Sequence, residues 1–212
     1  MLTSIITIIV IWLAVWIIWS FYIVKSIEKP SYNVTEIKDW YEIREYDPYI
    51  VAEVEVTGNQ QEALNQGFRL LAGYIFWGNT SKQSIAMTSP VNDITSSSEK
   101  ISMTSPVNDI ISKDNKHTVQ FILPGKYSLE TLPIPNNDSV KLREVQWYTA
   151  AALSYTLWAT QEKVAKNKLK MQKYLLRDNI EIVWDSISAQ YNPPLSFPFL
   201  RRNEIIIPIN QK

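Results

Sequence analysis

The side chains that most often carry chemistry are scarce in this chain. Its 212 residues include one histidine, His117, and no cysteine. Disulfides, thiol catalysis and cysteine metal sites are therefore excluded, as is a metal site that needs several histidines. A Ser-His-Asp triad would have to use His117. No nucleophile, base and orienting group can be recognised together, so we expect no catalytic residues and no enzymatic activity.

Three side chains could coordinate a metal such as iron, but each has a simpler structural role. His117 lies between the polar run 112–116 and a strand predicted at 118–123, a position typical of an exposed strand-end histidine. Met87 and Met103 alternate with isoleucine and valine, so we expect their thioethers to pack in an apolar core. We therefore assign no metal ligand.

Hydrophobic periodicity predicts the elements that position these residues. Alternating residues predict strands at 40–46 and 49–56, joined as a hairpin through a turn at Asp47-Pro48. A further strand is predicted at 118–123. The period becomes helical over 60–77, with one apolar stripe made by Leu64, Phe68, Leu71 and Ile75.

A long internal repeat, offset by about 100 residues, organises the chain. Residues 43–45 (IRE) match 142–144 (LRE), strand 49–56 matches 148–156, and a second helix is predicted over 161–176. We expect two fused β-β-α-β units related by a pseudo-two-fold axis, an α+β fold whose strands could close into a barrel. The repeated Arg-Glu pairs are expected to be solvated or paired across strands.

A short repeat lies between the two units. Residues 85–94 (IAMTSPVNDI) return as 101–110 (ISMTSPVNDI), with a polar linker between them. Isoleucine, methionine and valine fall at alternate positions in each copy, which predicts a β-hairpin with both methionines on one side. Pro90 and Pro106 restrict these strands to sheet edges, or break them.

The first 24 residues differ from the rest. Residues 2–24 carry no charge, proline or glycine, and as a helix they would extend about 34 Å, enough to cross a bilayer. A cleaved signal peptide is the alternative, but a basic start and a good cleavage site are missing. Lys25, Lys29 and Lys38 favour a single-pass protein with a cytoplasmic C-terminal domain. We predict an anchor (1–24), a stalk (25–38) and one domain (39–212).

Four ordered segments resemble the SOUL haem-binding family over about residues 39–209. The short repeat resembles that family's I-x-M-T-[AS]-P-V signature. The other segments are an opening (41–46, YEIREY), a middle stretch (126–133, KYSLETLP) and a tail (191–194, YNPP, followed by 201–205, RRNEI). The resemblance implies duplicated β-α-β-β units forming a distorted antiparallel barrel flanked by two helices.

The resemblance also implies that the chain binds haem or another tetrapyrrole and lacks catalytic residues. Haem contacts in the family lie on the first helix and in the loop before the final strand, here Asn65, Phe68, Ala72, Gly73 and Phe197. Glu45 occupies the position sometimes proposed for a haem-ligating histidine. The zero net charge gives no basis for nucleic-acid binding, and no protein partner can be named.

One face of the first helix agrees with this expectation. Asn65, Arg69, Ala72 and Phe76 are spaced by four, three and four residues. Ala72 would leave room for a flat tetrapyrrole and Phe76 would stack on it. Arg69 could pair with a propionate, because a guanidinium binds a carboxylate directionally. A helix flank with one solvated arginine is the alternative, and an effector-binding or scaffolding module is the second functional hypothesis.

Overall fold

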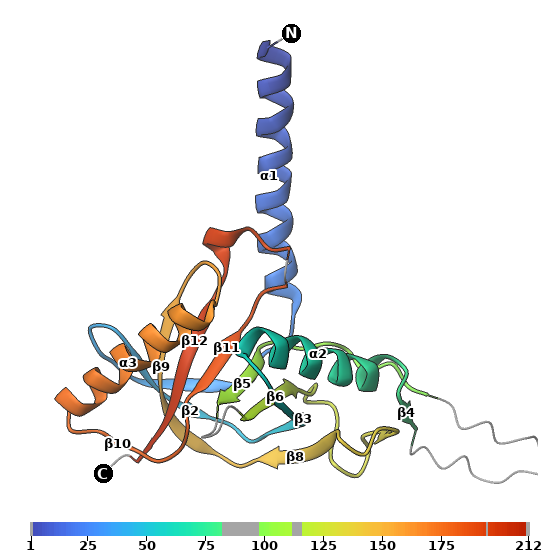
Figure 1. Cartoon of the computed structure of the whole chain (residues 1–212), viewed down its shortest axis with the longest axis vertical. Helices are drawn as coiled ribbons and strands as arrows, with labels where there is room; N and C mark the ends of the chain where they lie inside the picture. Colours follow the sequence, from blue (N-terminus) through green and yellow to red (C-terminus); the bar gives the residue numbers. More distant parts are fainter. Residues whose placement is uncertain (1, 82–97, 112–115, 194, 211–212) are drawn as a thin grey trace, which may run out of the picture.

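The computed structural model describes residues 2–81, 98–111, 116–193 and 195–210 (Figure 1). Three long helices accompany a mainly antiparallel sheet: α1 (Leu2–Ser26), α2 (Gln60–Phe76) and α3 (Gln161–Arg177). The strands are β1 (Tyr32–Ile37), β2 (Glu42–Tyr46), β3 (Tyr49–Thr57), β4 (Asn79–Thr80), β5 (Val107–Ile111), β6 (Lys116–Ile122), β7 (Ile134–Pro135), β8 (Lys141–Val145), β9 (Tyr148–Tyr155), β10 (Glu181–Ile182), β11 (Ile187–Gln190) and β12 (Asn203–Asn210).

The main sheet has the order β1-β2-β9-β12-β11-β5-β6-β3-β8, with β10 added beside β12. Strands β2 and β3 follow one another along the chain but do not pair; β2 pairs with β9, and β3 pairs with β8. The predicted hairpin at Asp47-Pro48 is therefore wrong. This turn carries the chain from one half of the sheet into the other, so both halves share one long antiparallel ribbon.

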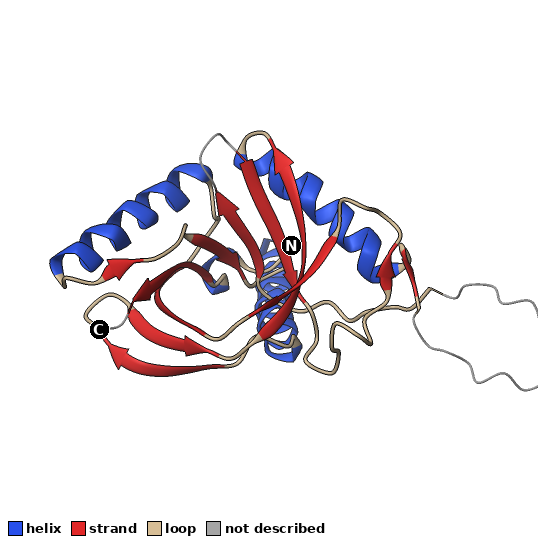
Figure 2. Cartoon of the chain, turned by 90° about the horizontal axis from the view of Figure 1, so that it is seen from below, coloured by secondary structure: helices blue, strands red, loops and turns tan. Residues whose placement is uncertain are grey.

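The register of this ribbon confirms the duplication. Ile43 lies opposite Ala151, and Ala52 lies opposite Leu142, so an offset of 99 residues converts one pair into the other. The β-α-β-β units implied by the family are β3-α2-β5-β6 and β9-α3-β11-β12. Strands β5 and β11 pair where the two units meet. The curled sheet and its two helices confirm the predicted α+β class (Figure 2).

Both helices cover the same face of the sheet. Along one row of directly opposed residues, Val119, Asp109, Ser188 and Ile205 point to the same side. Val119 belongs to the core under α2 and Ile205 to the core under α3. The opposite face carries a third apolar cluster, which includes the stacked rings of Tyr46 and Tyr148.

Helix α2 is rotated relative to the predicted stripe. It begins at the cap Asn59, whose side chain accepts a 3.0 Å hydrogen bond from the Glu62 amide. Leu71 and Ile75 are buried as predicted, whereas Leu64 is half-buried and Phe68 is 36% exposed. Ala63 and Gly67 complete the buried face instead. Gly67 allows this rotation, because a Cβ there would lie 2.6 Å from the Val119 side chain.

The segment after α1 departs from the predicted stalk. Residues 32–37 form β1, which pairs with β2 along the edge of the main sheet. Only residues 27–31 therefore connect the helix to the sheet. Main-chain hydrogen bonding, which composition does not reveal, recruits this polar segment into the domain.

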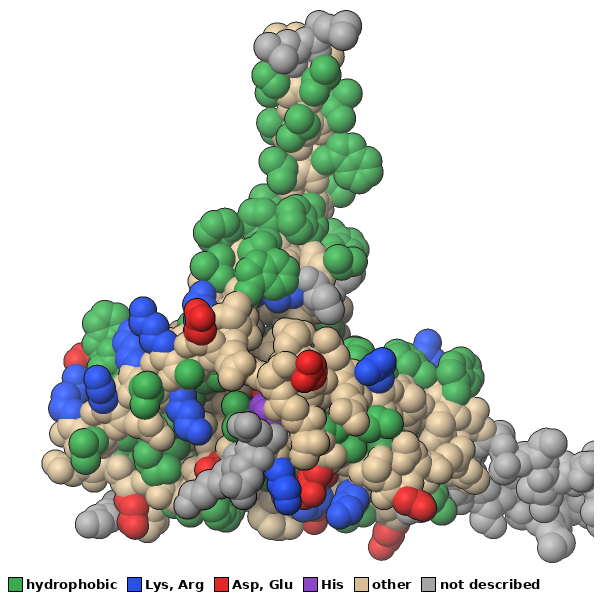
Figure 3. All heavy atoms as spheres, in the orientation of Figure 1, with side chains coloured by type: hydrophobic (Ala, Val, Ile, Leu, Met, Phe, Trp, Pro, Cys, Tyr) green, Lys and Arg blue, Asp and Glu red, His purple; other side chains and the backbone are tan. Residues whose placement is uncertain are grey.

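The apolar helix predicted at the start of the chain is confirmed as α1. Residues Thr3–Tyr22 are long and apolar enough to cross a membrane, a property shared by membrane anchors and signal sequences. Exposed hydrophobic side chains cover the projecting helix (Figure 3). Its N-terminal part stands clear of the domain (Figure 1).

The short repeat is described only in its second copy. Residues 85–94, with Met87 and the predicted first strand of the hairpin, lie outside the described residues. In the second copy Ile101 is buried, but Met103 is 38% exposed, so its expected core position is wrong. Strand β5 begins only at Val107, after Pro106, which removes a donor from any earlier ladder.

A buried ion network occupies the face of the sheet away from the helices. Glu204 on β12 is fully buried and accepts two hydrogen bonds from the Arg44 guanidinium, at 2.9 and 3.1 Å. Arg202, Tyr191 and Ser154 also donate to this carboxylate, at 2.8, 2.7 and 2.9 Å. Arg44 is thus buried rather than solvated. Its repeat counterpart, Arg143, pairs across strands with Glu53 as expected.

Replacing Gly67 by alanine should destabilise the domain by about 1–3 kcal/mol, because the new methyl group overlaps Val119. Chemical denaturation of the full chain in detergent measures this change. Gly73→Ala is the matched control: no atom lies within 4 Å of its added Cβ. That variant should gain about 0.5–1 kcal/mol in the same helix. Equal stabilities of the two variants would contradict the close approach of α2 and β6.

Acid should weaken the domain through Glu204. Burial by itself would raise the pKa of Glu204, but hydrogen bonds and charge from Arg44 and Arg202 lower it from 4.5 to about 2. The unfolded chain therefore binds more protons in this range, and stability falls as the pH drops from 4.5 towards 2.

Glu204→Gln should remove that part of the pH dependence. It should also cost about 3–5 kcal/mol at neutral pH, because Arg44 is left without its buried partner. Denaturation curves between pH 2 and 7 test both effects. Glu181→Gln, an exposed carboxylate on β10, is the control and should change neither. A variant that keeps the wild-type slope would contradict this role of Glu204.

Candidate ligand-binding groove

A groove of about 390 Å³ lies on the helix-covered face, where the two units meet. One side is the first half of α2, and the other is the loop that precedes α3. The segment between β11 and β12 completes it. The lining residues are Gln61, Leu64, Asn65, Phe68, Val107, Trp158, Ala159, Thr160, Gln190, Asn192 and Arg201.

The apolar part of the groove is aromatic at two points. Phe68 is 36% exposed, and its ring packs edge-on against Phe121, 5.2 Å away between centroids. Trp158 is half exposed in the middle of the loop between β9 and α3. Leu64 and Val107 add aliphatic surface. Exposed aromatic faces beside a polar group are what a flat amphiphilic ligand requires.

Arg201 is the charged group of the groove. It is 7% exposed, and its guanidinium lies 3.9 Å from the centre of the Trp158 ring. Its Nη2 donates to the Pro193 carbonyl at 2.9 Å. Burial lowers the pKa of Arg201, yet an arginine stays protonated at neutral pH. A guanidinium held on an aromatic ring at low exposure binds a carboxylate more strongly than a solvated one.

Side-chain alternation at the start of β12 brings Arg201 to this face. Arg202 and Glu204 face the buried ion network, so Arg201 and Asn203 point to the opposite, helix-covered side, where Arg201 lines the groove. Asn203 donates to the Leu157 carbonyl at 2.8 Å, and the Leu157 amide donates to the Pro198 carbonyl at 3.2 Å. These bonds hold Leu157 at a φ of 71°, a left-handed conformation that leucine rarely adopts. The strained turn places Trp158 over Arg201.

The structure places some of the predicted site residues in the groove and others outside it. Asn65 and Phe68 line the groove. Arg69, Gly73 and Phe76 are exposed outside it, and Phe76 lies 5.9 Å from the Lys100 ammonium. Ala72 packs against the core beneath α2. These residues do share a face of α2, but the groove closes over only the first half of the helix.

Phe197 lies against α1 rather than α2. Its ring meets the Trp16 ring edge-on at 5.1 Å, and its amide donates to Ser20 Oγ at 2.9 Å. Sequence reasoning missed Trp158 and Arg201. Arg201 belongs to the tail motif, to which we gave no ligand contact, and Trp158 lies outside all the motifs.

His117 is buried, contrary to expectation. It is 3% exposed, and its Nδ1 lies 2.8 Å from Asp109 Oδ1 on the neighbouring strand. Strand β6 begins earlier than predicted, at Lys116. His117 is therefore part of the strand, and its imidazole is buried. Neither partner lines the groove. The described lining residues of the groove include no imidazole or sulfur atom.

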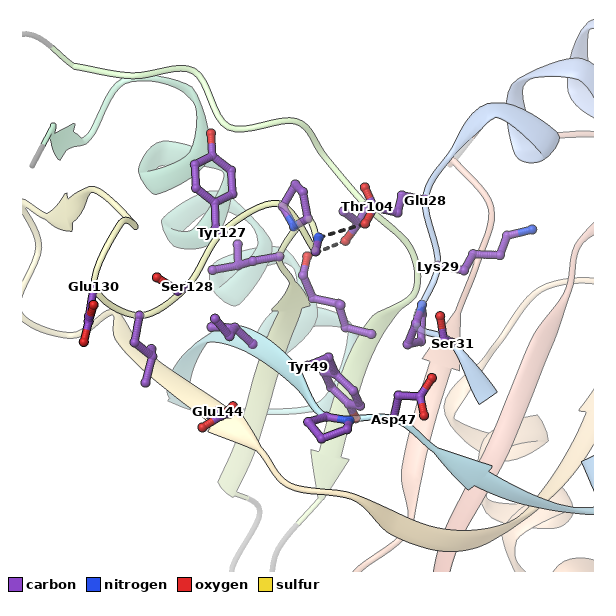
Figure 4. A pocket seen from close by; sticks show the side chains of 18 residues that line it. Glu28, Lys29, Ser31, Asp47, Tyr49, Thr104, Tyr127, Ser128, Glu130 and Glu144 are labelled. Atoms are coloured by element: carbon purple, nitrogen blue, oxygen red, sulfur yellow. Dashed lines mark hydrogen bonds between the residues drawn. The ribbon is translucent and has the colours of Figure 1, made fainter. Parts of the chain in front are cut away.

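A larger cavity, of about 550 Å³, lies where the segment after α1 meets the β2–β3 turn and the loop after β6 (Figure 4). Four carboxylates line it, from Glu28, Asp47, Glu130 and Glu144, against one ammonium, from Lys29. This charge balance is unfavourable for a ligand that carries carboxylates. The groove beside α2 is therefore the better site for such a ligand.

These features define a class of protein: a duplicated, curled-sheet α+β domain with an apolar helix before it. A family model described as SOUL heme-binding protein matches residues 27–208. The chain therefore belongs to the SOUL haem-binding protein family. No curated protein matches the chain.

Solved structures share the fold at low sequence identity. A hydrolase from Listeria innocua matches with a TM-score of 0.53 and 10% identity, covering 83% of this chain and 94% of that one. The EcmrR C-terminal domain matches with a TM-score of 0.54 and 9% identity, covering 85% and 99%. At these identities the likeness concerns the fold alone.

Proposed function

We propose that the chain is a binding protein, not an enzyme, that holds haem or another tetrapyrrole reversibly in the groove beside α2. It would act as a carrier, buffer or sensor near a membrane. The observation that carries the proposal is the buried Arg201 guanidinium stacked on Trp158, in a groove that the Phe68 ring also lines. Membership of the SOUL family supports the ligand class.

The groove residues fit the two chemical parts of a tetrapyrrole. Phe68, Leu64 and Val107 offer apolar surface to the ring, and Trp158 can stack on its edge. Arg201 can pair with a propionate, the role that we first gave to Arg69. Haem would bring iron to the site, but the lining side chains offer it neither imidazole nor sulfur. Affinity would then rest on apolar contact and ion pairing.

Helix α1 would keep this domain at a bilayer. Its candidate span ends at Tyr22, and Lys25 and Lys29 follow within seven residues. Basic residues on the C-terminal side favour a single-pass arrangement with the domain in the cytoplasm. Tetrapyrroles are amphiphilic and partition into membranes, so an anchored domain would meet its ligand there.

Haemin titration followed by Soret absorbance tests the proposal. The full chain in detergent should show saturable binding that empty micelles do not. Arg201→Gln should weaken binding at least tenfold, since a hydrogen bond to a charged group is worth about 1.5–3 kcal/mol. Arg69→Gln, exposed outside the groove, is the matched control and should bind as the wild type does.

Trp158→Ala tests the same site independently, in case the Arg201 variant misfolds. The circular dichroism spectra of both variants must match that of the wild type. Trp158→Ala should also weaken binding by about tenfold or less, because stacking contributes about 0.5–1.5 kcal/mol. The proposal would be wrong if no saturable Soret change occurred near stoichiometric haemin. If Arg69→Gln lost binding and Arg201→Gln did not, the binding site would lie further along α2, at Arg69.

A second candidate is an effector-binding module for another amphiphile. A cavity of about 350 Å³ on the helix-free face favours it, since Tyr49, Tyr148 and Trp184 line it together with Arg143 and Asp185. The two tyrosine hydroxyls are 3.0 Å apart. A thermal-shift screen in which other amphiphiles stabilise the chain, and porphyrins do not, would select this function.

Asn203→Ala should loosen the turn that carries Trp158, because the Leu157 carbonyl loses its donor. We expect a loss of about 1–3 kcal/mol in stability. Hydrogen exchange at residues 156–160, read by mass spectrometry, should become faster. Asn33→Ala on the exposed strand β1 is the control. An unchanged rate of hydrogen exchange would show that the left-handed turn is stable without the Asn203 hydrogen bond.

A further inference from the structure

The last turns of α1 are attached to the loop that leads into β12. The Trp16 indole Nε1 donates to the Leu195 carbonyl at 2.8 Å, and Ser20 Oγ accepts from the Phe197 amide at 2.9 Å. Ser20 is 1% exposed on a helix that is otherwise largely uncovered. The helix therefore meets the domain at a defined contact.

The same loop presents large apolar side chains to the outside. Leu195 and Phe199 are 73% and 69% exposed, and Leu200 is also exposed. The last two lie in the short helix η2 (Pro198–Leu200). Figure 1 places this segment beside the lower part of α1, and Figure 3 shows hydrophobic side chains continuing from the helix onto the domain there. The apolar surface is thus continuous with α1.

The contact sets the depth of this loop relative to the helix. The candidate span runs from Thr3 to Tyr22, so Trp16 lies about 9 Å, and Ser20 about 3 Å, inside its C-terminal end. A loop bonded at these two positions shares their depth. Apolar groups of peripheral elements enter the headgroup and acyl boundary to about 5–10 Å. The loop lies in that zone if α1 spans the bilayer.

We infer that residues 195–200 form a second membrane-contacting element, whose partner is the lipid surface into which α1 inserts. The inference rests on the proposed membrane role of α1. It also orients the groove: the Pro198 carbonyl holds the Leu157 amide, and Arg201 follows Leu200 directly. One edge of the groove therefore opens at the lipid surface, where an amphiphilic ligand enters sideways.

Site-directed fluorescence tests this arrangement. The chain has no cysteine, so single variants can be labelled uniquely with the environment-sensitive dye NBD. Phe199→Cys and Leu200→Cys report on the loop, and Ile9→Cys reports on α1. Leu176→Cys is the matched control, an exposed leucine in the last turn of α3, whose far end points away from α1 (Figure 2). Each full chain is reconstituted in phosphatidylcholine vesicles.

Labels at positions 199 and 200 should emit at shorter wavelength than the label at 176. They should also be quenched by lipids spin-labelled near the headgroup. If they behave like the label at 176 while the label at 9 is quenched, α1 is anchored and the loop proposal is wrong. If the label at 9 is also unquenched, α1 does not insert, and the loop proposal falls with the membrane role. Haemin binding in detergent tests the groove separately.

A double variant separates the loop from the groove. Phe199→Ser with Leu200→Ser should slow the uptake of haemin from loaded vesicles several-fold. Its haemin affinity in detergent should equal that of the wild type, since neither residue lines the groove. Wild-type uptake from vesicles would overturn lateral entry.

Discussion

The pairing of the buried Glu204 carboxylate with its donors is the interaction on which the rest of the structure depends. It takes donors from Arg44 on β2, Ser154 on β9 and Tyr191 after β11. A buried carboxylate is costly unless it is paired, and these donors reach it only when the strands lie in one register. Side chains alternate along this stretch, so Asn203 and the preceding Arg201 point to the opposite side, where Arg201 lines the groove.

The two-fold relation explains where a ligand site can form. The paired strands β5 and β11 join the units, and the groove lies above this junction, between α2 and the loop before α3. The units have diverged in their charged residues. The register that places Glu204 opposite Ser154 places Thr118 opposite Glu55 in the first unit, so the position equivalent to Glu204 carries no carboxylate there.

One stretch of chain, residues 192–204, connects the three functional parts. Phe197 contacts α1, Arg201 lines the groove, and Glu204 holds the ion network. The left-handed turn at Leu157 is bonded to this stretch at Pro198 and Asn203.

Local pattern in the sequence determined much of this protein. The uncharged run of residues 2–24 predicts α1, and the 99-residue repeat predicts the two units and their symmetry. Helical spacing and family likeness also pointed to Asn65 and Phe68, which line the groove. Only the tertiary structure decided that α2 rotates on Gly67, that His117 is buried against Asp109, and that Arg201 replaces Arg69 in the groove. Those outcomes depend on strand register and on contacts between residues far apart in the chain, which periodicity does not contain.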